Sequence, residues 1–241
     1  MNNLSKIDFV ILCGGLGKRL RSVTGDAPKV LAEVNGKPFL NVLIDYIAAQ
    51  GGKRFILCTG YGADVIEAYF KKTFQHLDIV FSREESPLGT GGAIKKGASL
   101  VQSEHFIAMN GDCFCTLEYK DLAKFHESHK AVATIAVNKV LESGDFGTIE
   151  FDHNNRILAF KEKIASGKSA YVNTGTYCLN KNIFSSVKTS EQFSIEYDFF
   201  PKLIGEEFFA YMAKGEFIDI GTPERYNQVQ QFLRKAGIHG A

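Results

Sequence analysis

The sequence has no long hydrophobic run. Nowhere in the 241 residues does a segment approach the roughly eighteen uninterrupted apolar residues of a membrane-spanning helix. The N-terminal stretch MNNLSKIDFVILCGG also lacks an apolar segment as long as that of a signal peptide. These absences predict a cytoplasmic protein with no membrane partner.

Excess charge and paired cysteines are lacking too. The chain has 28 Lys and Arg against 27 Asp and Glu, a net charge of +1, which gives no reason to expect nucleic acid or an anionic membrane as partner. The five cysteines are scattered without a C-x-x-C pair, which indicates reduced thiols. Cys113 and Cys115 have no matching pair or His motif elsewhere, so no zinc site is predicted.

What is present is the composition of an ordinary globular protein, with 45% hydrophobic and 23% charged residues. A chain of this length can bury a large core, and no repeat, linker or low-complexity tract divides it. We therefore expect one domain over residues 1–241, with an appended subregion, rather than two independent domains.

The stretch from Phe9 to Lys29, FVILCGGLGKRLRSVTGDAPK, organises the rest of the chain. Its unbroken apolar run is typical of a strand buried on both faces, and the run ends in a loop with three glycines in four positions. Such a loop lets the backbone approach a ligand and turn its N–H groups inward. Because Lys18, Arg19 and Arg21 follow at once, the loop suits a polyphosphate.

Two better-known glycine loops do not match. The dinucleotide fingerprint G-x-G-x-x-G would need a third glycine at position 20, where the chain has Leu20. A P-loop would need a glycine in place of Leu12 and a Ser or Thr in place of Arg19. The loop therefore belongs to neither class.

The remaining pattern is G-G-x-G-x-R-L, followed by Pro28-Lys29 and then by the segment VNGKPFL at 34–40. It resembles the signature of the sugar-1-phosphate nucleotidylyltransferases, roughly L-A-G-G-x-G-x-R-L, a spacer, P-K-P and V-x-G-K-P. The alternative is a tight turn whose basic residues form only a solvated rim. The ordered array of strand, glycines, arginine and lysines favours the resemblance, which extends from about Phe9 to Leu233.

The first half alternates strands and helices. Repeated β-α units imply a mostly parallel sheet covered by helices on both faces, a Rossmann-like α/β fold. We expect residues 1–130 to form a nucleotide-binding half. The expected helices are 38–50, 64–72 and 90–100, and the expected strands after the opening one are 54–59, 77–81 and 105–109.

Ligands of such sheets bind beyond the carboxyl ends of the strands. The first glycine loop, the glycine-rich helix entry at Gly89-Thr90, and Asp112 all follow apolar strands, so we expect them to open onto one crevice. Each has a plainer interpretation: a Gly-rich helix entry is usually only a turn, and an Asp at a strand end is often an Asx-turn or a helix cap.

The resemblance implies roles for residues of this half. Arg19 would hold the β- and γ-phosphates and Lys29 the α-phosphate as charge moves, which makes these two residues catalytic. Asp112 would be a Mg²⁺ ligand, consistent with the preference of a hard cation for oxygen. The nucleotide-binding residues would be Leu12, Gly14, Gly15, Gly17, Gly89 and Thr90.

The second half, residues 131–241, is expected to be a β-rich, sugar-binding insertion with a closing helix. Strands are predicted at 131–140 and 171–179, and hairpin arms at 147–151 and 156–161. By resemblance, the sugar-phosphate ligands would be Gly147, Glu162, Lys163, Asn173 and Thr174. For Glu162-Lys163 the alternative is a solvated surface pair, and Ile164 stands where the family has Pro.

Asp219 lies between Ile218 and Ile220, and an ionised carboxylate there is costly unless it is paired or metal-bound. The family's W-x-D-x-G-T-P matches from Asp219 to Pro223, with Phe217 in place of Trp, and implies that Asp219 is the second Mg²⁺ ligand. Thr222 is expected to cap the last helix, with Pro223 in its first turn.

Several segments, among them SPLGTGG at 86–92 and FSIE at 193–196, most resemble the branch of heptose 1-phosphate guanylyltransferases. The implied reaction is attack of a sugar 1-phosphate oxygen on the α-phosphorus of a nucleoside triphosphate, here GTP, yielding a nucleotide sugar for surface polysaccharide synthesis. A mannose 1-phosphate or other hexose 1-phosphate enzyme, a non-catalytic regulatory subunit of the same fold, and a homo-oligomer stay open.

Overall fold

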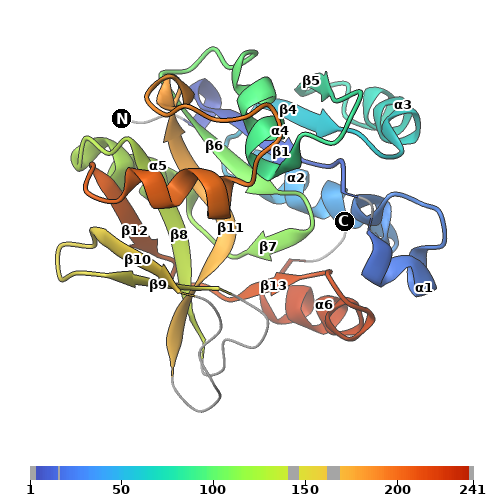
Figure 1. Ribbon diagram of the computed structural model, residues 1–241. Coiled ribbons are helices and arrows are strands. Elements are labelled where there is room, and N and C mark those ends of the chain that lie inside the picture. Colours follow the sequence, from blue (N-terminus) through green and yellow to red (C-terminus); the bar gives the residue numbers. More distant parts are fainter. Residues whose placement is uncertain (1–3, 16, 141–146, 162–168, 239–241) are drawn as a thin grey trace.

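The computed structural model describes residues 4–15, 17–140, 147–161 and 169–238, and its central feature is a nine-stranded sheet. The sheet runs in the order β10-β9-β11-β6-β1-β4-β5, while β8 pairs with β11 and β12 pairs with β8 (Figure 1). Its strands are β1 (Asp8–Leu12), β4 (Arg54–Thr59), β5 (Asp78–Arg83), β6 (His105–Asn110), β8 (Ala133–Val140), β9 (Thr148–Phe151), β10 (Ile157–Lys161), β11 (Ala170–Asn180) and β12 (Phe208–Met212).

The first half forms the predicted parallel sheet. Strand β1 lies between β4 and β6, and β5 pairs with β4, all in parallel. The helices expected in this half are confirmed as α2 (Phe39–Ala49), α3 (Ala63–Thr73) and α4 (Gly89–Ala98). The expected strands are confirmed as well, so the hydrophobic pattern located every one of these elements to within two residues.

The second half extends the same sheet instead of forming a separate wall. Strand β11 is antiparallel to β6, β8 and β9, and β9 and β10 form the predicted hairpin. The α/β class is therefore confirmed, with a mixed sheet: the run of parallel strands from β5 ends at β6, β11 is antiparallel to its neighbours, and β12 pairs with β8 in parallel. The register of β11 against β8 shifts between Asn173 and Tyr177, at a β-bulge that contains Gly175.

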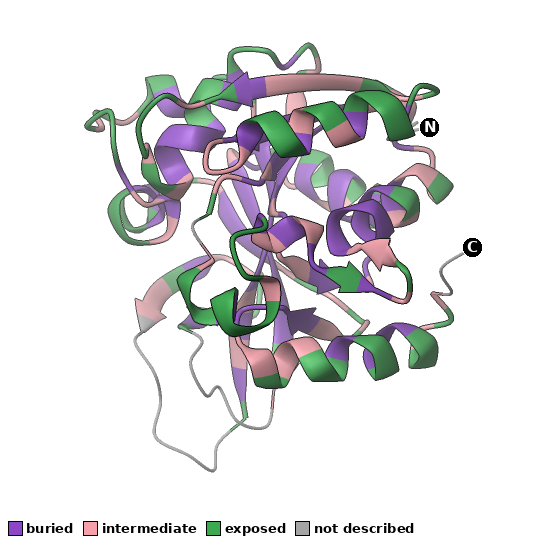
Figure 2. Cartoon of the chain, turned by 90° about the vertical axis from the view of Figure 1, so that its right-hand side faces the viewer, coloured by how far each residue is buried: buried purple, intermediate pink, exposed green. Residues whose placement is uncertain are grey.

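Both faces of the sheet are covered, because successive strand residues point to opposite sides. Phe9 and Ile11 of β1 belong to a core with residues of α2, α3, α5 (Tyr119–Ser128) and α6 (Pro223–Lys235). Val10 belongs to a second core with residues of α4 and of the segment around Phe199. Figure 2 shows these buried strands inside and the exposed faces of the helices outside.

Shorter elements connect these layers. Strand β7 (Cys113–Cys115) pairs with β13 (Phe217–Asp219), and β2 (Glu33–Val34) pairs with β3 (Lys37–Pro38). The remaining elements are α1 (Arg21–Thr24), a π-helix (Ile195–Phe199) and 3-10 turns at Leu4–Lys6, Lys18–Leu20, Lys29–Leu31, Ile183–Ser185 and Phe200–Leu203. No helix in the described ranges is long and apolar enough to cross a membrane.

Candidate active site

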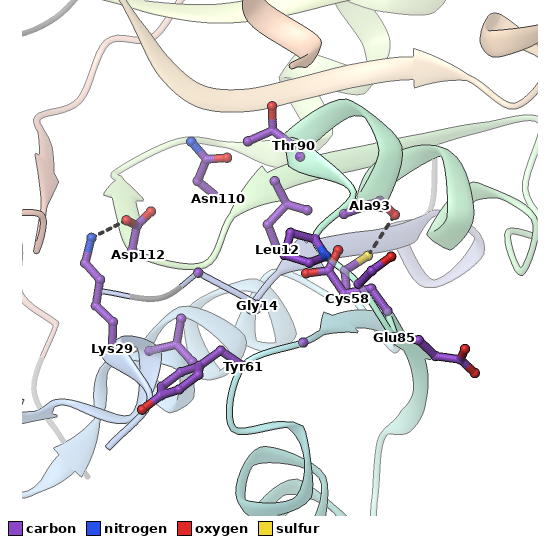
Figure 3. A pocket seen from close by; sticks show the side chains of 17 residues that line it. Leu12, Gly14, Lys29, Cys58, Tyr61, Glu85, Thr90, Ala93, Asn110 and Asp112 are labelled. Carbon is purple, nitrogen blue, oxygen red and sulfur yellow. Dashed lines mark hydrogen bonds and ion pairs between the residues drawn. The ribbon is translucent and has the colours of Figure 1, made fainter. Parts of the chain in front are cut away.

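A pocket of about 650 Å³ opens at the carboxyl ends of β1, β4, β5 and β6 (Figure 3). This is the edge at which ligands of parallel sheets bind. The pocket brings together seven of the predicted residues from segments far apart in the sequence. They are Leu12, Gly14, Gly15, Lys29, Gly89, Thr90 and Asp112.

Lys29 and Asp112 form an ion pair at one end of the pocket (Figure 3). Lys29 starts the 3-10 turn after Pro28, and Asp112 follows β6. The side chains are only 12% and 32% exposed, so this pair is shielded from water more than a surface ion pair. A cation and a carboxylate therefore lie side by side in the pocket at the carboxyl ends of the strands.

Asp219 reaches the same region through the small β7–β13 sheet. In that sheet Asp219 is the register partner of Cys113, and the Ile220 N–H donates to the Asp112 carbonyl over 2.9 Å. Burial, and then the charges of Asp112 and Asp219, raise the pKa of the Cys113 thiol well above its usual value, because both carboxylates lie close to it. The structure thus brings together two carboxylates that are more than one hundred residues apart in the chain.

The Asp219 side chain is 7% exposed, and its charge is compensated within the chain. One carboxylate oxygen accepts a hydrogen bond from the Gly221 N–H and lies 2.9 Å from Nε of Arg225, on the first turn of α6. Thr222 caps that helix as predicted, since its Oγ1 accepts from the Arg225 N–H over 3.3 Å. The position of Asp219 is therefore fixed by α6 as well as by β13.

The start of α4 forms another wall of the pocket. Gly89 has φ +71°, and a Cβ there would lie 2.5 Å from the Phe193 carbonyl oxygen, so this entry requires glycine. The N–H groups of Gly91 and Gly92 donate to that same carbonyl, over 2.9 and 3.4 Å. At the same helix N-terminus, Gly89 and Thr90 line the pocket.

Arg19 and Gly17 do not line the pocket. Gly17 is in the left-handed conformation, with φ +57°, and precedes the 3-10 turn in which Arg19 lies. The Arg19 side chain is exposed, and no ion pair within the described ranges holds it. Arg19 is therefore an exposed residue outside the pocket lining.

The residues predicted to bind the sugar phosphate lie in different surroundings. Asn173 lies at the bulge of β11, and Gly147 is exposed just before β9. The Thr174 side chain is completely buried, and its hydroxyl donates to the Ala136 carbonyl over 2.9 Å, so a contact of Thr174 with the sugar phosphate would have to use its backbone. Glu162 and Lys163 lie outside the described residues.

Other pocket residues were not predicted as site residues from the sequence, among them Cys58, Tyr61, Glu84 and Asn110. Glu84 directly follows β5 and Asn110 ends β6, so the strand-end argument used for Asp112 also applies to them. Cys58 is buried and its pKa is raised to about 12, first by that burial and then by the charge of Glu84. Its thiol therefore stays protonated and packs as an apolar group.

A glycine loop, a lysine and strand-end carboxylates around one pocket define a nucleotide-binding enzyme of the α/β class. Residues 9–236 match the model of the nucleotidyl transferase family, and the chain belongs to that family.

Relatives resemble the chain over nearly its whole length. It is 38% identical to the D-glycero-alpha-D-manno-heptose 1-phosphate guanylyltransferase of Aneurinibacillus thermoaerophilus, over 95% of this chain and 99% of the relative. The enzyme of the same name from Campylobacter jejuni is also 38% identical, over 90% and 96%. A mannose-1-phosphate guanylyltransferase of Mycobacterium tuberculosis is 33% identical over 92% of this chain and 63% of its own.

Solved structures are similar as well. HddC from Yersinia pseudotuberculosis has a TM-score of 0.84 at 38% identity, covering 93% of this chain and 98% of its own. The same protein in complex with GMP-PN has a TM-score of 0.82 over the same shares.

Proposed function

We propose that this protein transfers a guanylyl group from GTP to D-glycero-D-manno-heptose 1-phosphate and releases pyrophosphate. The observation that carries the proposal is the 38% identity to two enzymes of that name, over at least nine tenths of both chains. The product would be an activated heptose for surface polysaccharide synthesis. Mannose 1-phosphate is the second candidate acceptor, since a mannose-1-phosphate guanylyltransferase is 33% identical over 92% of this chain.

The acidic wall of the pocket supports guanine as the base. Glu84 and Glu85 both line the pocket after β5, and a carboxylate can only accept hydrogen bonds. Guanine carries two adjacent donors, N1–H and the N2 amine, whereas uracil and thymine carry one N–H between two carbonyl oxygens. A carboxylate at that edge would bond both guanine donors and repel the pyrimidine carbonyls.

The basic residues support binding of the triphosphate. Lys29 would exchange its contact with Asp112 for the α-phosphate, and Arg19 would fold over the β- and γ-phosphates from the solvent side. Because both reactants are anions and no protein nucleophile is needed, the protein's task is alignment and charge neutralisation. Leu12, Gly14, Gly15 and Gly17 would form the loop along the nucleotide, with Gly89 and Thr90 opposite.

Asp112 and Asp219 fit a divalent ion, which nucleotidyltransferases of this family typically use. Both are hard oxygen donors: Asp112 directly precedes β7, and Asp219 ends the neighbouring β13. Mg²⁺ is usually bound through one or two carboxylates plus substrate phosphates. When bound there, Mg²⁺ would neutralise charge on the triphosphate and the leaving pyrophosphate. Arg225 would keep the Asp219 carboxylate in place.

On the acceptor side, Lys163 would neutralise the sugar phosphate, and Glu162 and Asn173 would bind hydroxyl groups. Gly147 would contribute its backbone N–H, and Thr174 only its backbone. In this scheme residues 1–130 serve the nucleotide and residues 131–241 the sugar phosphate. The free thiols and the use of GTP support a cytoplasmic enzyme, and a homo-oligomer remains an expectation.

A matrix of substrates tests the proposal. GTP, ATP, UTP and CTP would each be combined with the 1-phosphates of heptose, mannose, glucose and N-acetylglucosamine, with Mg²⁺, and pyrophosphate release would be measured. We expect the highest kcat/KM for GTP with heptose 1-phosphate. A higher value for another base or sugar would refute the specificity, and no release with any pair would refute the activity and favour a regulatory subunit.

The expected discrimination between the two leading acceptors is limited. Heptose carries one more hydroxymethyl unit than mannose, and the pocket partners of that unit would be left unsatisfied with mannose, at roughly 1–3 kcal/mol. Heptose should therefore be preferred by about tenfold to two-hundredfold. Equal kcat/KM values for the two acceptors would mean that the site has no partners for that unit.

A further inference from the structure

The Glu196 carboxylate connects the two halves of the site. It lies on the π-helix, a rare element that is frequent at functional sites. Its Oε2 accepts from Thr90 Oγ1 over 2.7 Å and from Ser194 Oγ over 2.8 Å, and its Oε1 accepts from the Tyr177 hydroxyl over 3.1 Å. One side chain thus binds a residue of the nucleotide pocket and a residue of β11.

On the β11 side, this contact determines how Asn173 is oriented. A carboxylate only accepts, so the Tyr177 hydroxyl must donate to Glu196 and can only accept from its other neighbour. That neighbour is Asn173, whose Nδ2 donates to the Tyr177 hydroxyl over 3.0 Å. Burial and the Glu196 charge raise the pKa of Tyr177 well above its usual value, so the phenol keeps the proton it donates.

The amide oxygen of Asn173 supports the same orientation of its side chain. The Gly175 N–H donates to Asn173 Oδ1 over 2.8 Å, which independently places the oxygen there. Gly175 itself lies against the pocket residue Asn110, since a Cβ on it would be 2.6 Å from Asn110 Nδ2. The two hydrogen bonds therefore fix the orientation of the Asn173 amide, and one N–H and one oxygen lone pair remain for a further partner.

On the nucleotide side, the same carboxylate determines what Thr90 offers. The Thr90 hydroxyl donates to Glu196 and accepts from the Ile195 N–H over 2.9 Å. Its hydrogen and one lone pair are thereby used, and one lone pair remains. Thr90 lines the pocket, and toward any further partner its hydroxyl can only accept, so it suits an N–H or O–H of the nucleotide.

We infer that Glu196 is a positioning residue that sets the donor and acceptor directions of Thr90 in the nucleotide pocket and of Asn173 on the sugar side. The inference rests on the proposed function, in which these two residues contact different substrates. A carboxylate that only tied the two halves together would affect stability. A carboxylate that sets directions also affects the KM of both substrates.

Glu196→Gln tests the difference, because it keeps the size but replaces one acceptor oxygen with a donor. Thr90 and Tyr177 donate to different oxygens of Glu196, so the NH2 group of Gln deprives one of them of its acceptor. The other keeps only a neutral acceptor, which is weaker than a carboxylate. We expect the KM values for GTP and for the sugar phosphate to rise by about three- to tenfold each, the range of one or two hydrogen bonds. Glu191→Gln makes the same carboxylate-to-amide change at an exposed residue five positions earlier and should leave both KM values unchanged.

Tyr177→Phe removes only the hydrogen bonds that link Glu196 to Asn173 on the sugar side. It should raise the KM for the sugar phosphate by about three- to tenfold and leave the KM for GTP unchanged. Tyr171→Phe makes the same chemical change on the same strand, away from Glu196, and should change neither KM. Thr90→Val should give the reverse pattern, with only the KM for GTP raised.

The outcomes separate this inference from the proposed function. An inactive wild-type protein would refute the proposed function. If the wild type is active and Glu196→Gln lowers Tm but leaves either KM within twofold of wild type, then Glu196 only stabilises the fold and the inference is wrong. If Glu196→Gln does not fold, a Tyr177→Phe variant that raises both KM values or neither overturns the inference.

Discussion

The two halves of the sheet hold their site residues in different ways. In the parallel half, Lys29, Gly89 and Asp112 lie in loops or helix starts that follow strands, and the backbone places them. In the antiparallel half, Asn173 lies within β11 at a bulge, and side-chain hydrogen bonds to Tyr177 hold it. In the proposed function, nucleotide binding would thus depend on chain topology, and sugar binding on a polar network.

This difference predicts where each half is sensitive. A backbone-placed site loses function when a charged ligand group is removed, while its fold remains intact. A network-placed site is sensitive to protonation and to small steric changes, because buried hydrogen bonds depend on each partner. The following predictions test that contrast, from the largest expected effect to the smallest.

Asp112→Asn and Asp219→Asn should each reduce kcat/KM by roughly 10²–10³-fold, the order seen when a charge-stabilising group is lost. Each change removes metal-binding charge but little volume. Both variants should also lower Tm, because Asp112→Asn leaves Lys29 and Asp219→Asn leaves Arg225 beside a neutral amide, and both cations are largely shielded from water. Pyrophosphate release and thermal unfolding measure both effects. Wild-type rates in either variant would exclude a metal role for that residue.

Acidification should weaken the antiparallel half. Buried His126 contacts Thr134 of β8 and Asn180 of β11, at 2.9 and 3.0 Å, and burial lowers its pKa to about 4. The folded state therefore resists a proton that the unfolded chain binds below about pH 6.5. Stability should fall between pH 6.5 and pH 4, by about 3 kcal/mol in total.

The variant His126→Gln should lose that part of the pH dependence of the unfolding free energy, measured in urea. In the wild-type protein, amide exchange should show the loss of stability at low pH first in β8 and β11 and later in β1 and β4. Equal exchange rates in both halves at pH 5 would contradict the contrast between them.

Arg19→Ala should raise the KM for GTP by about tenfold to a hundredfold, because it removes a cation facing the terminal phosphates. The Tm should not change, since Arg19 is exposed. The exposed Arg234→Ala, far along α6, is the matched control. If GTP kinetics were the same in both variants, the opening loop would have no phosphate role.

Gly175→Ala should destabilise the protein by about 1–2 kcal/mol, because its φ of +71° is unfavourable for alanine. The added Cβ would also press on Asn110, so the KM for the sugar phosphate should rise as well. Gly205→Ala, at φ +100° with no atom within 4 Å, separates backbone strain from this contact. A Gly175→Ala variant with unchanged sugar-phosphate KM would show that the bulge does not position the sugar site.

Local sequence patterns predicted most elements correctly, because hydrophobic periodicity and capping act over a few residues. They missed α1, α5, β2, β3, β7, β12, β13 and the π-helix. Strands β7 and β13 are too short to show a period. Their pairing, which brings Asp112 close to Asp219, joins residues about a hundred positions apart.

By itself, the sequence determined the glycine loop, the strand–helix order and the charged groups available for the chemistry. Only the tertiary structure decided which of them act together. It buried the Thr174 hydroxyl against Ala136, brought Glu84 into the pocket, and linked Thr90 through Glu196 to Tyr177. The physical reason is that side-chain environment and hydrogen-bond direction depend on neighbours supplied by distant segments. These neighbours come together only when the whole sheet has formed and its two cores have packed.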